Sequence, residues 1–175
     1  MKFDIQNPAF MQAACAIENS TIIMRCSIGD FDPSFRSIGS VEATFIKNGK
    51  EEKIIQNSEN GSTEFSITCD PNSNIIFRGK IIEIYDKKDD GRYESLEYLD
   101  VRRAKSLNTV SLGTSVVSSI AIKADREDLA NSIANTITFS LSDDGQVLLE
   151  DRNAQYNQII IDAALDKGWD FEYGN

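Results

Sequence analysis

The chain has 175 residues, and its 41% hydrophobic and 26% charged side chains are typical of a folded globular protein rather than a disordered one. Its formal net charge of -10 disfavours a nucleic-acid partner, because a polyanion would approach against a repulsive field. The absence of histidine excludes Ser-His-Asp and Cys-His catalysis and histidine-ligated zinc.

The first residues of the chain are a poor match to an export signal. Asp4 and Pro8 interrupt the opening segment. The tetrad Gln12-Ala13-Ala14-Cys15 resembles a lipoprotein cleavage box, but the apolar segment before it is short. No apolar run approaches the ~18 residues of a membrane span. We therefore expect Met1 to be a native start, with no standard export signal and no membrane span.

Three cysteines, Cys15, Cys26 and Cys69, make neither an even set nor a CxxC motif. We expect three reduced and buried thiols, because a reduced cysteine packs as a small apolar side chain. A disulfide between Cys15 and Cys26 is the alternative for an exported chain.

Residues 1–74 are predicted to form a β-rich N-terminal domain, as an antiparallel sheet or sandwich. The apolar segment 21–28 reads as an extended strand that ends at a Gly-Asp turn. Alternating residues 41–46 lead into Asn48-Gly49 and then into the apolar segment 53–55. An Asn-Gly pair between two apolar runs predicts a tight hairpin.

The most informative stretch repeats one template, apolar-x-x-apolar-x-apolar, three times. Its units begin at Leu96, Leu107 and Val117, so the full period is 21 residues. All nine template positions are aliphatic: Leu96, Leu99, Val101, Leu107, Val110, Leu112, Val117, Ile120 and Ile122. In a solenoid coil of this period, the first and third units stack as parallel neighbours and the middle unit closes the opposite wall.

The segments Leu96-Glu97-Tyr98-Leu99-Asp100-Val101 and Leu107-Asn108-Thr109-Val110-Ser111-Leu112 resemble the 21-residue leucine-rich repeats of Bacteroidetes BspA-like and internalin-like surface proteins. Residues 153–171, which contain Lys167-Gly168-Trp169, resemble the C-terminal unit that follows such repeats. The resemblance covers about residues 75–175, although the repeats are few and lack the usual Asn of each turn. It implies a second domain over 75–175, a short leucine-rich-repeat-like coil closed by a β-α-β cap. The predicted class is thus α+β, mainly β.

The C-terminal unit can also be predicted from its residues alone. Asp125 is placed to cap a helix that runs through Ile133, and 147–149 reads as a short strand. A second helix ends at Gly168, a residue that favours the left-handed conformation of a helix stop. Trp169 is expected to anchor the core beneath this cap, and an exposed contact is its alternative role.

Two acidic loops are the nearest approach to a metal site. They contain Asp86, Asp89 and Asp90, and Asp143-Asp144-Gly145. Calcium takes several oxygen ligands, but neither spacing matches an EF-hand loop. We interpret both segments as turns. No catalytic, cofactor-binding or metal-ligating residue is assigned.

The basic pairs Lys87-Lys88 and Arg102-Arg103 are interpreted as solvated turns and strand faces, not as a nucleic-acid site. The sequence predicts a non-enzymatic structural or protein-interaction module, without a cofactor, that meets a protein partner or assembles with itself. A cell-surface protein is one setting. A virion structural or head-decoration protein of a phage infecting Bacteroidetes, made in the cytoplasm and assembled into the particle, is the alternative. A carboxylate-dependent hydrolase is the remaining alternative, because that chemistry needs no histidine.

Overall fold

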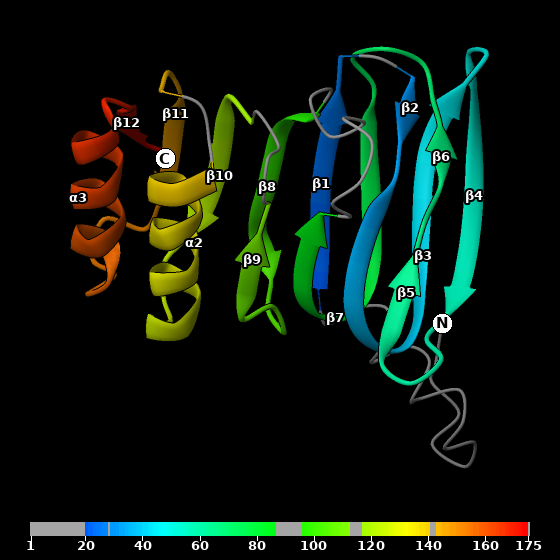
Figure 1. The fold of residues 1–175 in the computed structure, drawn as a ribbon, viewed down its shortest axis with the longest axis horizontal. Helices are drawn as coiled ribbons and strands as arrows, with labels where there is room; N and C mark the ends of the chain where they lie inside the picture. Colours follow the sequence, from blue (N-terminus) through cyan, green and yellow to red (C-terminus); the bar gives the residue numbers. More distant parts are fainter. Residues whose placement is uncertain (1–19, 28, 87–95, 113–116, 141–142, 175) are drawn as a thin grey trace, which may run out of the picture.

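The computed structural model of the chain describes residues 20–27, 29–86, 96–112, 117–140 and 143–174. These residues are mainly β, and ten of the strands join in one mixed sheet. Two helices lie together against one end of that sheet (Figure 1). The prediction of an α+β class, mainly β, is confirmed.

The main sheet has the strand order β12 (Asp170–Tyr173), β11 (Gln146–Glu150), β10 (Ser119–Lys123), β8 (Leu96–Ala104), β1 (Ser20–Cys26), β7 (Asn74–Asp86), β3 (Pro33–Lys47) and β4 (Lys50–Asn57). Two further strands pair off this path, β5 (Ser62–Glu64) with β3 and β9 (Thr109–Ser111) with β7. A separate two-stranded sheet is formed by β2 (Asp30–Phe31) and β6 (Ile67–Thr68). The helices are α2 (Glu127–Ser140) and α3 (Asn157–Lys167).

The predicted hairpin is present between β3 and β4. Lys47 pairs with Lys50, and the two turn residues have the positive φ angles that such a turn demands, 52° at Asn48 and 71° at Gly49. The Asp70 carboxylate accepts hydrogen bonds of 2.8 Å from both turn N–H groups. A carboxylate 21 residues away therefore fixes a turn that the local sequence already favours.

The long strands β3 and β7 pair with each other in the antiparallel half of the sheet. Their pairing skips two residues between Ile38 and Val41, opposite Gly79. A Cβ at Gly79 would lie 2.7 Å from the Ser40 carbonyl oxygen, so the two backbones approach too closely there for a side chain. Such a bulge bends both strands.

An aromatic cluster fills the core on this side of the molecule. The rings of Phe35, Phe65 and Phe77 lie 4.7 to 5.8 Å apart between centroids, at inclined angles. Their side chains are almost fully buried. Inclined aromatic contacts of this kind add stability beyond the buried area alone.

The other half of the sheet is built from parallel strands. Leu99 on β8 pairs with Ile120 on β10, Ile120 with Val147 on β11, and Val147 with Phe171 on β12. The spacings along this row are 21, 27 and 24 residues. The first and third template units thus stack as parallel neighbours, as the 21-residue period predicts.

All nine aliphatic template positions are buried, none being more than 3% exposed. The middle unit contributes β9, which lies against α2 and outside the parallel row (Figure 1). The Val110 carbonyl on β9 accepts hydrogen bonds from the Ser132 and Thr136 hydroxyls of α2, and Ser132 Oγ also accepts the Val110 N–H at 2.7 Å. The Val110 N–H and carbonyl are in this way satisfied by a helix, while β9 also pairs with β7.

The end of the chain consists of a helix followed by an edge strand. Gly168 follows α3 in the left-handed conformation, with φ of 84°, and β12 follows as the edge strand. Trp169 is only 2% exposed, which supports its role as a core anchor. Its ring lies so close to Gly145 that a Cβ there would overlap it. The indole of Trp169 therefore packs directly against the expected Asp-Asp-Gly turn.

The predicted end of the first helix at Ile133 is wrong, because α2 continues to Ser140. Its buried face continues through Ile137, which is fully covered. The helix begins at Glu127, and the Arg126 carbonyl accepts the first helical hydrogen bond, from Ala130 at 3.0 Å. Contacts that arise only from the fold, and not the local cap signal, set the length of this helix.

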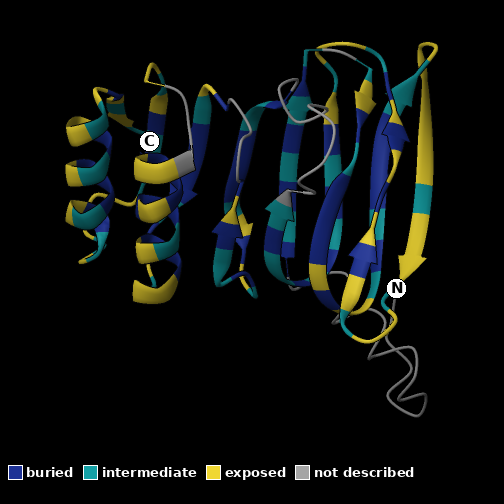
Figure 2. Cartoon of the chain, viewed as in Figure 1, coloured by how far each residue is buried: buried dark blue, intermediate teal, exposed yellow. Residues whose placement is uncertain are grey.

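The predicted domains 1–74 and 75–175 share one sheet. Strand β7, at the start of the second segment, pairs with β1 and β3 of the first. Figure 2 shows buried residues on the strands of that sheet from β11 to β3, on both sides of the predicted boundary. The division into two domains stays a prediction.

Replacing Leu99 or Ile120 with Asp is expected to abolish cooperative folding. Each substitution buries an unpaired carboxylate, at a cost comparable with a total stability of about 5–15 kcal/mol. Thermal unfolding followed by circular dichroism measures the effect. Ile38→Asp, the same kind of change at a 53% exposed position of β3 that pairs with Lys80, is the matched control and should melt near the wild-type temperature. Cooperative melting of both core variants would contradict the buried parallel row.

Gly145→Ala is expected to destabilise the protein by about 1–3 kcal/mol, because the new methyl group overlaps the Trp169 ring. Gly174→Ala is the matched control, since its Cβ would lie 3.5 Å from Leu148, an ordinary contact. Urea denaturation followed by the fluorescence of Trp169 compares both variants with the wild type. Equal stability of all three proteins would show that the indole does not depend on Gly145.

Candidate functional site

One face of the parallel strands is the candidate interaction face. Leu99, Ile120 and Val147 point into the core, which α2, α3 and β9 cover from one side (Figure 1). Side chains alternate along a strand, so the neighbouring positions point to the opposite side. We call that side the open face; on β8, β10, β11 and β12 it carries Tyr98, Asp100, Arg102, Ser119, Ala121, Lys123, Gln146, Leu148, Glu150, Asp170 and Glu172.

The centre of the open face is a buried carboxylate. Asp100 is 7% exposed and accepts four hydrogen bonds. Arg102 donates three of them, from its backbone N–H at 3.0 Å, Nε at 3.0 Å and Nη2 at 2.6 Å. Tyr98 donates the fourth from its hydroxyl at 3.2 Å. A buried charge that is paired and fully hydrogen-bonded holds these three side chains in one arrangement.

Burial by itself would raise the pKa of Asp100, but the hydrogen bonds and positive charge of Arg102 outweigh it and lower that pKa. The hydrogen bond to Asp100 in turn raises the pKa of Arg102. Burial, and then the charge of Asp100, raise the pKa of Tyr98. All three groups keep their ordinary charge at neutral pH, so the cluster is a structural ion pair and not a proton-transfer site.

The open face continues onto β1, where its mixture of aromatic, basic and aliphatic side chains is typical of protein interfaces. The Arg25 guanidinium lies over the Tyr98 ring, 5.2 Å from its centroid. Beside it Ile23 pairs across the sheet with Ile76, and both are half-buried. Leu148 is also half-buried on β11. Tyrosine, arginine and aliphatic side chains in one surface are the composition favoured at the centre of interfaces.

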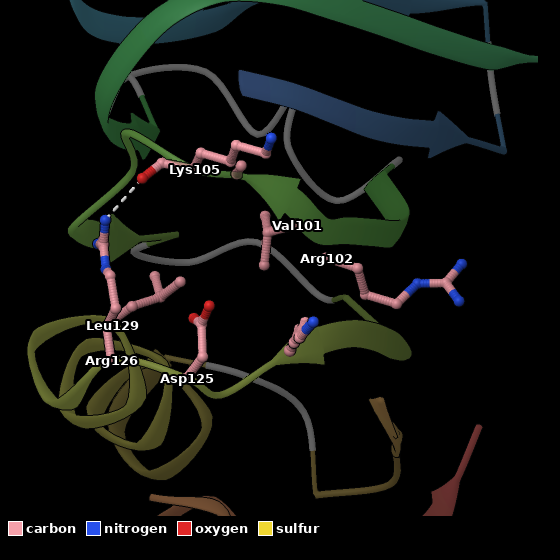
Figure 3. A pocket seen from close by; sticks show the side chains of 8 residues that line it. Val101, Arg102, Lys105, Asp125, Arg126 and Leu129 are labelled. Atoms are coloured by element: carbon pink, nitrogen blue, oxygen red, sulfur yellow. Dashed lines mark hydrogen bonds between the residues drawn. The ribbon is translucent and has the colours of Figure 1, made fainter. Parts of the chain in front are cut away.

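The pairing of β8 with β10 ends at Asp100 and Ala121, because Arg102 donates its N–H to the Asp100 side chain instead of continuing the ladder. Beyond that point the strand ends enclose two adjoining hollows, of about 100 and 310 Å³. They share three lining residues, Arg102, Lys105 and Lys123. We call the two together the strand-end hollow; Figure 3 shows the smaller part.

The strand-end hollow is basic. Its lining contains Arg102, Arg103, Lys105, Lys123 and Arg126 against the two carboxylates Asp125 and Glu150. Five cations against two carboxylates leave a net charge of +3, in a chain whose net charge is -10. The strand ends therefore form a positive surface within an acidic protein.

Two of these cations are already engaged. Arg102 serves Asp100 and also lies 3.7 Å from a Glu150 oxygen. Arg126 lies 3.2 Å from Asp128 and donates to the carbonyls of Lys105 and Leu107. The dashed line in Figure 3 is the first of these carbonyl contacts. Arg126 thereby fixes the turn that follows β8.

The sequence interpretation of Arg102-Arg103 as an ordinary solvated pair overlooked their surroundings. The fold brings Lys123 beside them, exactly one 21-residue period after Arg102. That spacing was the signal that could have predicted the cluster. Lys87-Lys88 lies outside the described residues.

Within the residues that the structure describes, the two acidic loops do not form a metal site. Asp143 pairs with Lys167 at 3.0 Å in the turn next to Trp169. Asp86 ends β7, whereas Asp89 and Asp90 lie outside the described residues. Among the residues with described positions, no group of three metal-type ligands occurs.

Two of the three cysteines can be placed. Cys26 and Cys69 are free and buried, as predicted, and Cys15 lies outside the described residues. Burial raises the pKa of the Cys26 thiol, and the neighbouring Cys69 adds to the effect. Cys26 is thus held as a neutral thiol in the core.

Comparison of the chain with protein-family models, with curated proteins and with solved structures finds no match. Neither of the described helices has the length and apolar character needed to cross a bilayer. The open face and the strand-end hollow are therefore interpreted from their own chemistry.

Asp100→Asn is expected to lower the free energy of unfolding at neutral pH by about 1–3 kcal/mol, because it removes a buried ion pair. A lowered native pKa means that the ionised form stabilises the fold. That contribution is complete above the unfolded pKa of about 3.9 and is lost as the pH falls through the lower native pKa. The difference between wild type and variant should therefore shrink below about pH 4.

Chemical denaturation at a series of pH values measures this difference. Glu172→Gln, at an exposed position of the same face, is the control and should follow the wild-type curve. A difference between wild type and Asp100→Asn that stays constant down to the lowest pH would contradict the assignment of the stabilising charge to Asp100.

Proposed function

We propose that this protein is a non-enzymatic protein-interaction module, built on a leucine-rich-repeat-like scaffold, that binds its partner through the open face. The observation that carries the proposal is a sheet face that none of the described helices or strands covers. Its centre is an ordered group of tyrosine, arginine and aliphatic side chains around the buried Asp100.

The parallel row supports the scaffold part of the proposal. Leu99, Ile120 and Val147 recur at related spacings, and the chain crosses to β9 or a helix between successive strands. In leucine-rich repeats each unit likewise supplies one strand to a shared parallel face, and repeat proteins bind through such faces. The chain contributes four strands to this row, and β1 widens the same face.

The rigidity of the open face supports the interaction part. Tyr98, Asp100 and Arg102 are tied by hydrogen bonds, so these side chains lose little additional freedom when a partner covers them. Tyrosine and arginine are enriched among the residues that dominate binding energy. Ile23 and Leu148, both half-buried, offer apolar area on either side of this cluster.

The hydrolase alternative receives less support from the same surface. Glycoside hydrolysis needs two carboxyl groups facing one substrate bond. Each part of the strand-end hollow is lined by a single carboxylate, Asp125 in one and Glu150 in the other. The Asp100 carboxylate is saturated by Arg102 and Tyr98.

Ile23→Arg and Leu148→Arg are expected to weaken partner binding by at least about tenfold, as the loss of a central interface contact does. Leu165→Arg is the matched control, because Leu165 is 56% exposed on α3, away from the open face. The purified full chain is immobilised, and proteins captured from the native extract are quantified for wild type and each variant. Light scattering during size-exclusion chromatography tests self-association of the same proteins.

Two results would contradict this proposal. One is capture or self-association that the open-face variants leave intact and Leu165→Arg abolishes. The other is a wild-type protein that stays a monomer and enriches no protein over a bead control. Circular dichroism of each variant establishes beforehand that it is folded.

A further inference from the structure

We infer that the strand-end hollow is an anion site that takes the phosphate group of a phosphomonoester. This site goes beyond the proposed function, because it lies at the ends of β8 and β10 and its test does not depend on a partner of the open face. The juxtaposition that carries the inference is three cations around one hollow, Arg103, Lys105 and Lys123, none of which forms an ion pair with a described residue.

The fold creates the space at a defined point. β8 and β10 separate after Asp100 and Ala121, and the pairing of β8 with β1 skips a residue in the same region, between Thr21 and Ile23. Both irregularities lie toward the carboxyl end of β8, which is the parallel neighbour of β10. Clefts at that end of a parallel sheet are where α/β proteins bind their ligands. A volume of about 310 Å³ suits a small ligand.

The charges of the hollow are not balanced by the protein. Among the described residues, no carboxylate lies within salt-bridge distance of Arg103, Lys105 or Lys123, whereas Arg102 has two and Arg126 has one. Glu150 is directed to Arg102, 3.7 Å away. An anionic ligand would therefore meet three cations that need not first break an ion pair.

The same arrangement selects the class of anion. A single carboxylate is matched by one cation, as Asp100 is by Arg102 on the neighbouring face. A phosphomonoester carries a charge of about -1.5 to -2 at neutral pH and three acceptor oxygens. Arginine forks and lysine ammonium groups are the usual donors to such oxygens. Two carboxylates on the rim, Asp125 and Glu150, oppose a long polyanion that would pass over both.

The experiment titrates the full-length protein with inorganic phosphate, ribose 5-phosphate and a phosphoserine peptide, at neutral pH and an ionic strength held constant with chloride. Isothermal calorimetry and amide shifts in nuclear magnetic resonance report binding. Wild type should show saturable binding of at least one ester. The double variant Arg103→Gln with Lys123→Gln should bind at least about tenfold more weakly. Lys105→Gln alone should weaken binding in the same direction and serves if the double variant fails to fold.

The matched control is Lys50→Gln with Lys80→Gln, which removes two cations from β4 and β7 without touching the hollow. It should bind as the wild type does. Tighter binding of ribose 5-phosphate supports a free metabolite, and tighter binding of the peptide supports a phosphorylated side chain. The inference is overturned if no ester binds saturably, if the hollow variants bind as tightly as wild type, or if inorganic phosphate binds more tightly than both esters.

Discussion

Strand β1 is the element on which the rest of this fold depends, because it joins the antiparallel half of the sheet to the strand that begins the parallel half. One edge pairs with β7 from Thr21 to Arg25, and the other with β8 from Ser20 to Cys26. Without it the antiparallel half and the parallel half would each end in an exposed row of unpaired backbone groups, which proteins avoid. Its inward side chains Ile22 and Met24 are buried in the core that both halves share. The first described segment of the chain thus occupies the middle of the sheet.

This central position explains the arrangement of the surface. β8 receives β1 on one edge in antiparallel sense and β10 on the other in parallel sense. The pairing of β8 with β1 skips a residue between Thr21 and Ile23, and the pairing of β8 with β10 ends at Asp100. Both ladders are therefore interrupted close to Asp100. The Asp100 carboxylate satisfies the Arg102 N–H that the ladder leaves free, at 3.0 Å. One side chain therefore ends the pairing, opens the strand-end hollow and fixes the arginine beside it.

The sequence predicted those elements whose structure is determined by residues close to one another in the chain or by a regular repeat. Asn48-Gly49 imposes a hairpin because few other residue pairs adopt its two positive φ angles, and the 21-residue period brings Leu99 beside Ile120 because each coil repeats the same path. The insertion of β1 between β7 and β8 was not predictable in this way. Its partners on β8 lie about 80 residues further along the chain, and any exposed strand edge offers the same backbone groups. The helix end missed at Ile133 has a related cause, since α2 extends along a partner, β9, that the fold supplies.

The candidate site likewise depends partly on residues that are neighbours in the sequence and partly on residues that only the fold brings together. The Arg102-Arg103 pair is visible in the sequence. The sequence does not show which of the nearby acidic side chains pairs with either arginine in the fold. In the fold Asp100 pairs with Arg102, whereas Arg103 and the distant Lys123 have no carboxylate partner in the part of the chain that the structure describes. Asp100 already accepts hydrogen bonds from Tyr98 and Arg102, so the cations left for an anion in the neighbouring hollow are other residues. The buried ion pair can then order the open face while the unpaired cations attract a ligand, and each task has its own residues.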